Sequence, residues 1–245
     1  MSTKKISVDV VIPVFNEADV LERNIVILQD FLSKNSDFLW KIVIADNGST
    51  DSTPYIAQKL ASQNYAITYL HVPVKGRGLA LRTAWLESQA DIVSYMDADL
   101  STNINYFPLL IEGIKCGYDV AIGSRLMGTS RVRRRLKREI VSRTFNAIIK
   151  ILFLNKFSDA QCGFKALKRE VAQKVLPEVR NNNWFFDTEL LLLTESLKYR
   201  IFEVPVEWTD DLTTKVRIFE TVIEDILGLL RVRFSMRKNK TDVNK

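Results

Sequence analysis

The chain has 245 residues, 47% of them hydrophobic, and carries a formal net charge of +6. This length suits one large domain or two fused halves, and the apolar fraction is sufficient for a substantial core. The two cysteines, Cys116 and Cys162, exclude a disulfide framework and a CxxC pair, and no apolar run reaches the ~18 residues that span a bilayer. We therefore expect a protein of a reducing cytosol whose basic charge indicates an anionic partner.

Short apolar runs rich in β-branched residues alternate with helical patterns along the first half of the chain. The predicted strands span residues 6–12, 40–45, 66–72, 92–96 and 120–122, and the predicted helices span 18–33, 53–64, 78–88 and 104–116. The first run ends at Pro13 without a small-residue cleavage site, so we interpret it as a strand and not as a signal peptide. The alternation predicts an α/β fold with a doubly wound, mostly parallel sheet.

Polar residues and glycines gather where the predicted strands end. They lie at residues 13–17, 46–51, 75–78, 97–99 and 123–125. In doubly wound sheets, ligands bind beyond the carboxyl ends of the strands. The five segments together therefore predict a ligand site at one edge of the sheet, more strongly than any single motif does.

Asp97 and Asp99 follow the fourth predicted strand and are the most informative pair in the chain. Side chains at i and i+2 of an extended chain point to the same side. Two carboxylates on one side can hold Mg²⁺ or Mn²⁺ and leave coordination sites for phosphate oxygens. A solvated turn after a strand would be the better explanation of an isolated Asp-x-Asp, but the position in a β/α series favours the metal site.

Three other strand ends carry candidate ligand residues. Asp46 follows an apolar strand and could bond a base or a ribose, and the next two residues, Asn47-Gly48, predict a turn with positive φ. Glu17 is similarly placed, although an acid in a first helical turn is also favoured by the helix dipole. The segment 75–78, Lys-Gly-Arg-Gly, precedes a helix and suits either a phosphate loop or a flexible turn, but it is not a P-loop.

A basic segment covers residues 125–143 and is the candidate cradle for an anionic acceptor. Its cations are Arg125, Arg131, Arg133, Arg134, Arg135, Lys137, Arg138 and Arg143, with Glu139 as the only acid. Arg138 and Ser142 lie at i and i+4, on one helix face. We favour a solvated role for any single arginine of the 131–135 run. Nucleic-acid binding is disfavoured because the segment lacks interleaved aromatic residues.

Two apolar helical patterns in the second half fit either the core or an anionic membrane surface. The first lies at 141–153, directly after basic residues, and the second lies at 218–230 and is followed by Arg231, Arg233, Arg237, Lys238 and Lys240. Residues 238–245 are expected to be a disordered tail. Asp187 could simply cap its helix, and His71, the lone histidine, is expected to be structural.

These motifs together resemble a known family. VVIPVFNE, DNGSTD, KGRG, DAD, GSR and DAQCGFK (159–165) occur in the order seen in family 2 glycosyltransferases of the GT-A (Rossmann-like) fold. The chain is most similar to the dolichyl-phosphate glucosyl- and mannosyltransferases and their prokaryotic polyprenyl-phosphate relatives. WFFDTELL (184–191) and VPVEWTDD (204–211), followed by Lys215, are closer to the glucosyl branch.

The resemblance implies one glycosyltransferase domain over residues 1–245, with helices on both faces of its sheet. Residues 1–125 would form the nucleotide-sugar half and 126–237 the acceptor half with amphipathic helices, followed by the 238–245 tail. The implied donor-site residues are Pro13, Phe15, Glu17, Asp46, Gly48, Lys75, Gly76 and Asp97. The implied metal ligands are Asp97 and Asp99. The implied acceptor-phosphate residues are Arg125, Arg138, Ser142 and Lys215, and the implied catalytic set is Asp97, Asp99, Arg125 and Asp187.

The implied reaction is an inverting, metal-dependent transfer of a hexose, with glucose favoured, to a polyprenyl or dolichyl phosphate. The expected donor is a UDP-sugar rather than a GDP-sugar, the expected cofactor is Mg²⁺ or Mn²⁺, and the expected location is the cytoplasmic face of a membrane, bound peripherally. Mannosyl relatives often carry a metal-binding Gln where this chain has Ser101, so the third metal ligand stays open. An acceptor phosphate is already anionic and needs a positive cradle, which arginine provides, rather than a base.

Two other hypotheses stay open beside this one. An enzyme of the same fold could act on a soluble saccharide or a glycolipid. A non-catalytic basic module could bind nucleic acid or anionic lipid, but the acids at 46–51 and 97–99 would repel such polyanions unless a metal intervened. The sequence leaves the sugar, the donor base, the isoprenoid length and the oligomeric state open.

Overall fold

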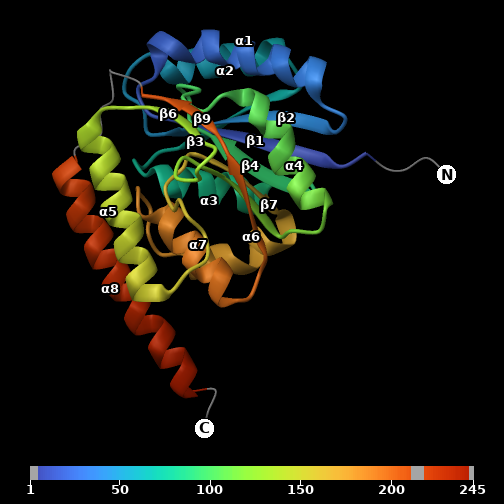
Figure 1. The fold of residues 1–245 in the computed structure, drawn as a ribbon. Coiled ribbons are helices and arrows are strands. Elements are labelled where there is room, and N and C mark those ends of the chain that lie inside the picture. The colour runs from blue at the N-terminus through green and yellow to red at the C-terminus, as the bar shows by residue number, and fades with distance from the viewer. Residues whose placement is uncertain (1–4, 211–217, 243–245) are drawn as a thin grey trace.

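A seven-stranded sheet forms the centre of the molecule in the computed structural model, which describes residues 5–210 and 218–242 (Figure 1). Its strands are β1 (Ser7–Val14), β2 (Leu39–Asn47), β3 (Ile67–Val72), β4 (Ile92–Met96), β5 (Val120–Ser124), β7 (Phe164–Lys168) and β8 (Ile201–Pro205). They lie in the order β3-β2-β1-β4-β7-β5-β8, and every neighbouring pair is parallel except the two that involve β7. The predicted mostly parallel α/β sheet is thus confirmed.

Helices cover both faces of this sheet and bury two hydrophobic clusters (Figure 1). One face carries α1 (Ala18–Asn35), α2 (Thr53–Gln63) and α4 (Phe107–Lys115), and the other carries α3 (Arg77–Glu87), α6 (Arg169–Val175) and α7 (Phe186–Ser196). The spacing of apolar residues explains the packing. Leu21, Ile25, Leu28 and Leu32 recur on one face of α1, and all four are buried.

The antiparallel strand β7 was not predicted from the sequence. It pairs with β4 on one side and β5 on the other, so these two strands do not pair with each other. Its five residues are too few to show a period, and the two lysines among them hide its apolar character. A separate ribbon joins β6 (Arg131–Arg133) to β9 (Glu207–Thr209) in parallel.

Helices α5 (Leu136–Phe153) and α8 (Ile218–Asp242) lie side by side at one end of the molecule (Figure 1). Both contribute to the core, since Ile149, Leu229 and Val232 are buried. α8 continues through Asp242, and the expected disorder of the 238–245 tail stays a prediction. Among the described helices, none is both long enough and apolar enough to cross a membrane.

Candidate active site

The loops that follow β1 and β2 are tied together by Asn16. Its Oδ1 accepts a hydrogen bond from the backbone N of Thr50 at 2.8 Å, and its own backbone N donates to Ser49 Oγ at 2.9 Å. Glu17 is joined to the same loop, because its backbone N donates to Thr53 Oγ1 at 2.9 Å. These hydrogen bonds join the loops that follow β1 and β2. They therefore lie together at the edge of the sheet where a ligand site is expected.

Asp46 lies at the end of β2 and is completely buried. Its Oδ1 accepts from Ser49 N at 3.0 Å, and its Oδ2 accepts from Tyr69 Oη at 3.0 Å and lies 3.1 Å from His71 Nδ1. Burial, followed by the bond to Asp46, raises the pKa of Tyr69 to about 12, so the phenol stays a donor. Both oxygens of Asp46 therefore have protein partners, and its contact with a base or ribose stays a prediction.

The Lys-Gly-Arg-Gly segment (75–78) lies beside the end of β1. Lys75 Nζ is 4.2 Å from the centre of the Phe15 ring, a cation–π contact. The backbone N of Gly76 donates to Asn47 Oδ1 at 3.3 Å, and Gly48 has a φ of +80°, which confirms the predicted turn. The structure thus brings Phe15, Lys75 and Gly76 together, while Pro13 lies within β1 behind them.

Arg77 lies in the same loop but was not among the site residues predicted from the sequence. Its side chain is 11% exposed and bridges two carboxylates, with Nη2 2.8 Å from Asp97 Oδ1 and Nη1 2.7 Å from Asp187 Oδ2. Asp187 also accepts from Tyr95 Oη and lies 2.9 Å from Lys165 Nζ, which is fully buried. Two cations and two carboxylates therefore form one charge-compensated network at the end of β4, buried except at Asp97.

This network determines the chemistry open to Asp187. Burial acts to raise the pKa of its carboxyl, but the charges of Lys165 and Arg77 outweigh burial and lower the pKa. Asp187 lies in the first turn of α7 and is not its cap residue. Its observed contacts are with protein groups, so its direct catalytic role stays a prediction and its observed effect is to hold Arg77 against Asp97.

The two acids of the Asp-x-Asp motif lie in a turn after β4, not in an extension of the strand. Leu100 N donates to Asp97 O at 3.1 Å, and Leu100 has a φ of +52°, so the alternation of an extended strand does not apply to Asp97 and Asp99. The chain turns directly after Met96, so strand alternation no longer supports a common direction of the two carboxylates, which stays a prediction.

The turn still offers hard oxygen ligands suited to a divalent ion. Within the described residues, no group of three or more His, Cys, Asp or Glu side chains could hold a metal. Mg²⁺ commonly takes one or two carboxylates and completes its shell with substrate phosphates and water, which fits Asp97 and Asp99. Asp99 also borders an open pocket of about 490 Å³, whose other lining residues are Leu100, Ser101, Asn103, Glu207, Thr209 and Asp210.

Gly163 fixes how closely β7 approaches this turn. A Cβ at this position would lie 1.7 Å from Asp97 Oδ2, so only glycine leaves room for the carboxylate as it stands. The backbone N of Asp97 also donates to Gly163 O at 3.2 Å. The DAQCGFK segment thus reaches the Asp-x-Asp turn through its glycine, while its Lys165 pairs with Asp187.

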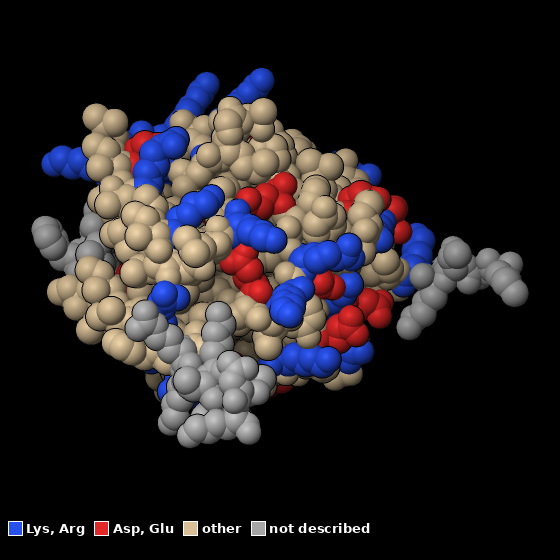
Figure 2. Space-filling model, turned by 60° about the horizontal axis from the view of Figure 1, so that its bottom comes forward, with Lys and Arg blue, Asp and Glu red and all other residues tan. Residues whose placement is uncertain are grey.

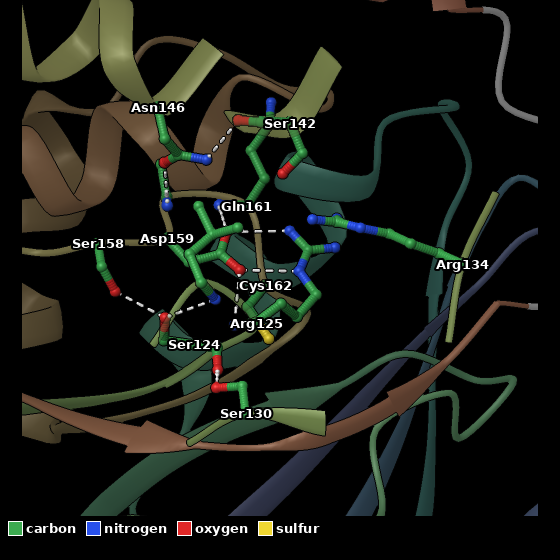
Figure 3. Close-up of polar contacts among 12 residues, drawn as sticks. Ser124, Arg125, Ser130, Arg134, Ser142, Asn146, Ser158, Asp159, Gln161 and Cys162 are labelled. Atoms are coloured by element: carbon green, nitrogen blue, oxygen red, sulfur yellow. Dashed lines mark hydrogen bonds and ion pairs between the residues drawn. The ribbon is translucent and has the colours of Figure 1, made fainter. Parts of the chain in front are cut away.

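Arg125 is held by a buried carboxylate that the sequence did not assign (Figure 3). Its Nε and Nη2 lie 2.8 and 2.9 Å from the two oxygens of Asp159, and its guanidinium lies 5.6 Å from the centre of the Trp208 ring. Burial opposes ionisation of Asp159, yet the facing Arg125 lowers its pKa to about 2. Arg125 is thus a fixed, charged group, and Asp159 occupies one side of its planar guanidinium.

The other predicted acceptor residues are only partly described. Arg138 and Ser142 both lie on α5 as expected, and Arg138 forms an ion pair with Asp210. Lys215 lies outside the described residues. Nearby, Gln161 Nε2 donates to Asp225 Oδ2 on α8 at 3.0 Å, and burial raises the pKa of Asp225 to about 7.

An α/β sheet with one antiparallel insertion, whose parallel strands end in a carboxylate turn and a glycine-containing loop, defines the GT-A class of glycosyltransferases. Residues 9–176 match the family described as Glycosyl transferase family 2, and the chain belongs to this family. The fold and family expected from the motifs are thereby confirmed.

Curated relatives lie within the same family. Glycosyltransferase AglD of Haloferax volcanii is 34% identical over 230 residues, which cover 91% of this chain but only 36% of AglD. Dolichyl-phosphate beta-glucosyltransferase ALG5C of Trichomonas vaginalis is 31% identical over 239 residues, covering 93% of this chain and 71% of the relative. The dolichyl-phosphate beta-glucosyltransferase of Saccharomyces cerevisiae is 29% identical over 228 residues, covering 84% and 67%.

Solved structures share the fold. Glucosyl-3-phosphoglycerate synthase from Mycobacterium tuberculosis, in complex with Mn²⁺, UDP and glucosyl-3-phosphoglycerate, superposes with a TM-score of 0.65. It is 22% identical to this chain, and the match covers 93% of this chain and 80% of that one. This similarity shows the fold. A statement about the substrate has to rest on the residues of this chain.

Proposed function

We propose that this chain transfers a hexose, with glucose favoured, from a UDP-sugar to a polyprenyl or dolichyl phosphate with inversion at the anomeric carbon. The names of the curated relatives support the acceptor class and the sugar, and the solved relative with bound UDP and Mn²⁺ supports the donor and the ion. The observation that carries the proposal is the adjacency of two charged sites. Asp97 is hydrogen-bonded to Gly163 and Arg125 to Asp159, so one short segment holds both the carboxylate turn and the candidate phosphate ligand.

The proposed reaction needs no general base. A phosphate oxygen of the acceptor attacks the anomeric carbon, the bond from that carbon to the nucleoside diphosphate breaks, and its electron pair leaves with the diphosphate. No proton moves, because the acceptor phosphate is already ionised near neutral pH. A divalent ion held by Asp97 and Asp99 would neutralise charge on the leaving diphosphate.

The chain's own residues supply position and charge for this step. Lys165 pairs with Asp187, which holds Arg77, and Arg77 in turn pairs with Asp97, so the carboxylate turn is preorganised by a chain of ion pairs. Asp159 holds Arg125 in a fixed orientation beside the turn. Preorganised charges of this kind stabilise a transition state without rearranging during the reaction.

We also propose that the protein binds peripherally to the cytoplasmic face of a membrane through α5 and α8. Both helices expose large apolar side chains, namely Leu136, Ile140, Ile148 and Ile151 on α5, and Ile223, Leu227 and Phe234 on α8. Figure 2 shows Lys and Arg interspersed with Asp and Glu over the described part of one face, not gathered in one basic patch. Attachment would therefore rest on these apolar residues and on the local cations of 131–143.

An alternative keeps the fold but changes the acceptor to a soluble saccharide or a glycolipid. The pocket of about 490 Å³ supports it, because its carboxylates, Asp99, Glu207 and Asp210, suit a hydroxyl-rich ligand. A donor and acceptor screen separates the two proposals. UDP- and GDP-sugars are each tested with Mg²⁺ or Mn²⁺ against a short polyprenyl phosphate and the matching alcohol. We expect transfer from a UDP-sugar to the phosphate only, and transfer to the alcohol would overturn the mechanism without a base.

A further inference from the structure

Arg134 is buried, although it belongs to a basic run for which solvent exposure was expected. Its side chain is only 4% exposed, and it forms an ion pair with Glu139 through Nε. Its Nη2 is buried and has no hydrogen-bond partner among the described residues. Arg131 and Arg133, on β6 just before it, are exposed as expected. A guanidinium taken out of water needs acceptors for its hydrogens, so an unused buried nitrogen requires a physical reason.

The direction of the side chain supplies that reason. In Figure 3, Arg134 reaches across from β6 with its guanidinium pointing toward that of Arg125. Two cations facing each other in a poorly solvated place repel, and each has its carboxylate elsewhere, Asp159 for Arg125 and Glu139 for Arg134. Glu139 is also shared with Arg143, so it does not neutralise Arg134 alone. An anion between the two guanidiniums would satisfy the free nitrogen and remove the repulsion.

The chemistry of the pair selects the anion. Planar guanidiniums bind phosphate oxygens through paired hydrogen bonds, and a phosphate monoester offers three terminal oxygens with nearly two negative charges. Two guanidiniums would engage two of these oxygens and leave the third for attack on the sugar. Arg125 is held by Asp159, in the segment whose Gly163 contacts Asp97, and would place that third oxygen toward the donor side.

We propose that Arg134 is a further acceptor-binding residue, which with Arg125 clamps the phosphate monoester of the acceptor. The inference rests on the proposed function and adds a residue to its acceptor site. It also explains why the 131–135 run places one arginine inward between exposed ones.

The test compares Arg134→Gln with Lys174→Gln, which removes one positive charge from an exposed residue of α6. Acceptor KM is measured with a short polyprenyl phosphate, and UDP binding is measured by calorimetry in the presence of Mn²⁺. Losing one charge-assisted bond should raise the KM of Arg134→Gln roughly ten- to hundredfold, with UDP affinity and the Lys174→Gln enzyme unchanged. If the unpaired partners prevent folding of Arg134→Gln, Arg134→Lys keeps the charge without the fork and should still raise KM.

The outcomes separate the inference from the proposed function. If the wild type uses polyprenyl phosphate and the Arg134 variants match Lys174→Gln, Arg134 has no acceptor role and the proposed function stands. If the wild type glycosylates the neutral alcohol equally well, the proposed function fails. A third arm uses 3-phosphoglycerate as a soluble phosphate monoester. Acceptance of this compound, with the same dependence on Arg134, would retain the clamp but move the phosphate from a lipid to a soluble acceptor.

Discussion

Replacing Gly163 with alanine should disable the active site while leaving the fold nearly intact. The new Cβ would lie 1.7 Å from Asp97 Oδ2 and 2.3 Å from Asp97 Cγ, whereas Cβ contacts below 3.0 Å are essentially never seen. The carboxylate must therefore retreat by at least 1.3 Å. Because the Asp97 side chain is 37% exposed, it can turn toward solvent.

The cost to stability and the cost to activity should differ widely. Turning Asp97 breaks its 2.8 Å pair with Arg77, but Arg77 keeps Asp187 at 2.7 Å and is not left uncompensated. Off-rotamer strain of this kind costs about 0.5–1.5 kcal/mol. By contrast, a displacement of about 1 Å at a reacting group can lower the rate on the order of a hundredfold.

The assay measures kcat/KM for sugar transfer and the free energy of unfolding in urea, with Gly128→Ala as the matched control. A Cβ at Gly128 meets nothing within 4 Å, so this variant should behave as the wild type in both assays. Activity of Gly163→Ala within threefold of the wild type would refute the reasoning. Loss of stability as large as the loss of transition-state free energy would also refute it, since the effect would then be general unfolding.

Three further predictions concern the metal, a buried acid and the membrane. Asp99→Asn should abolish transfer without lowering Tm, because an amide lacks the charge that a divalent ion requires, and normal turnover in excess EDTA would contradict this. Asp225 has its pKa raised to about 7, so its contribution to stability is complete below about pH 4 and is lost as the pH rises through 7. Asp225→Asn should therefore gain stability over the wild type by up to about 2.5 kcal/mol more at pH 8 than at pH 5, and a pH-independent difference in urea unfolding would disprove the shift. The protein should sediment with anionic liposomes and detach as salt rises, each nearby cation adding about 1 kcal/mol, and equal binding to neutral vesicles would count against it.

The first half of the fold could be predicted because each element carries its own signal. The apolar run at 92–96 became β4 with the predicted bounds, and the alternating helices fell within a few residues of their expected ends. β7 was missed because its position depends on pairing with β4 and β5, which the five residues FKALK do not encode locally. Tertiary pairing rather than propensity decides such a strand.

The site shows the same division between local and long-range information. The turn at Gly48 was predictable because Asn-Gly sets φ locally. Arg77, Asp159 and Lys165 were missed because their importance comes from partners far away in the sequence, such as the pair between Arg77 and Asp187. A lysine inside a buried strand was the available signal for Lys165, since a charge at such a position needs a counter-ion.

The insertion of β7 also constrains how the chain reaches its native state during synthesis. Within the described residues, β5 pairs only with β7 and β8, which are made later, and about 40 residues separate Ser124 from Phe164. At translation rates of about 5–20 residues per second, β7 is made roughly 2–8 seconds after β5, which has no partner strand until then. During this interval the free edges of β4 and β5 could pair with other chains, and the turn at Asp97 lacks Gly163 and Lys165. The emerging enzyme is thus inactive and open to aggregation until its second half leaves the ribosome.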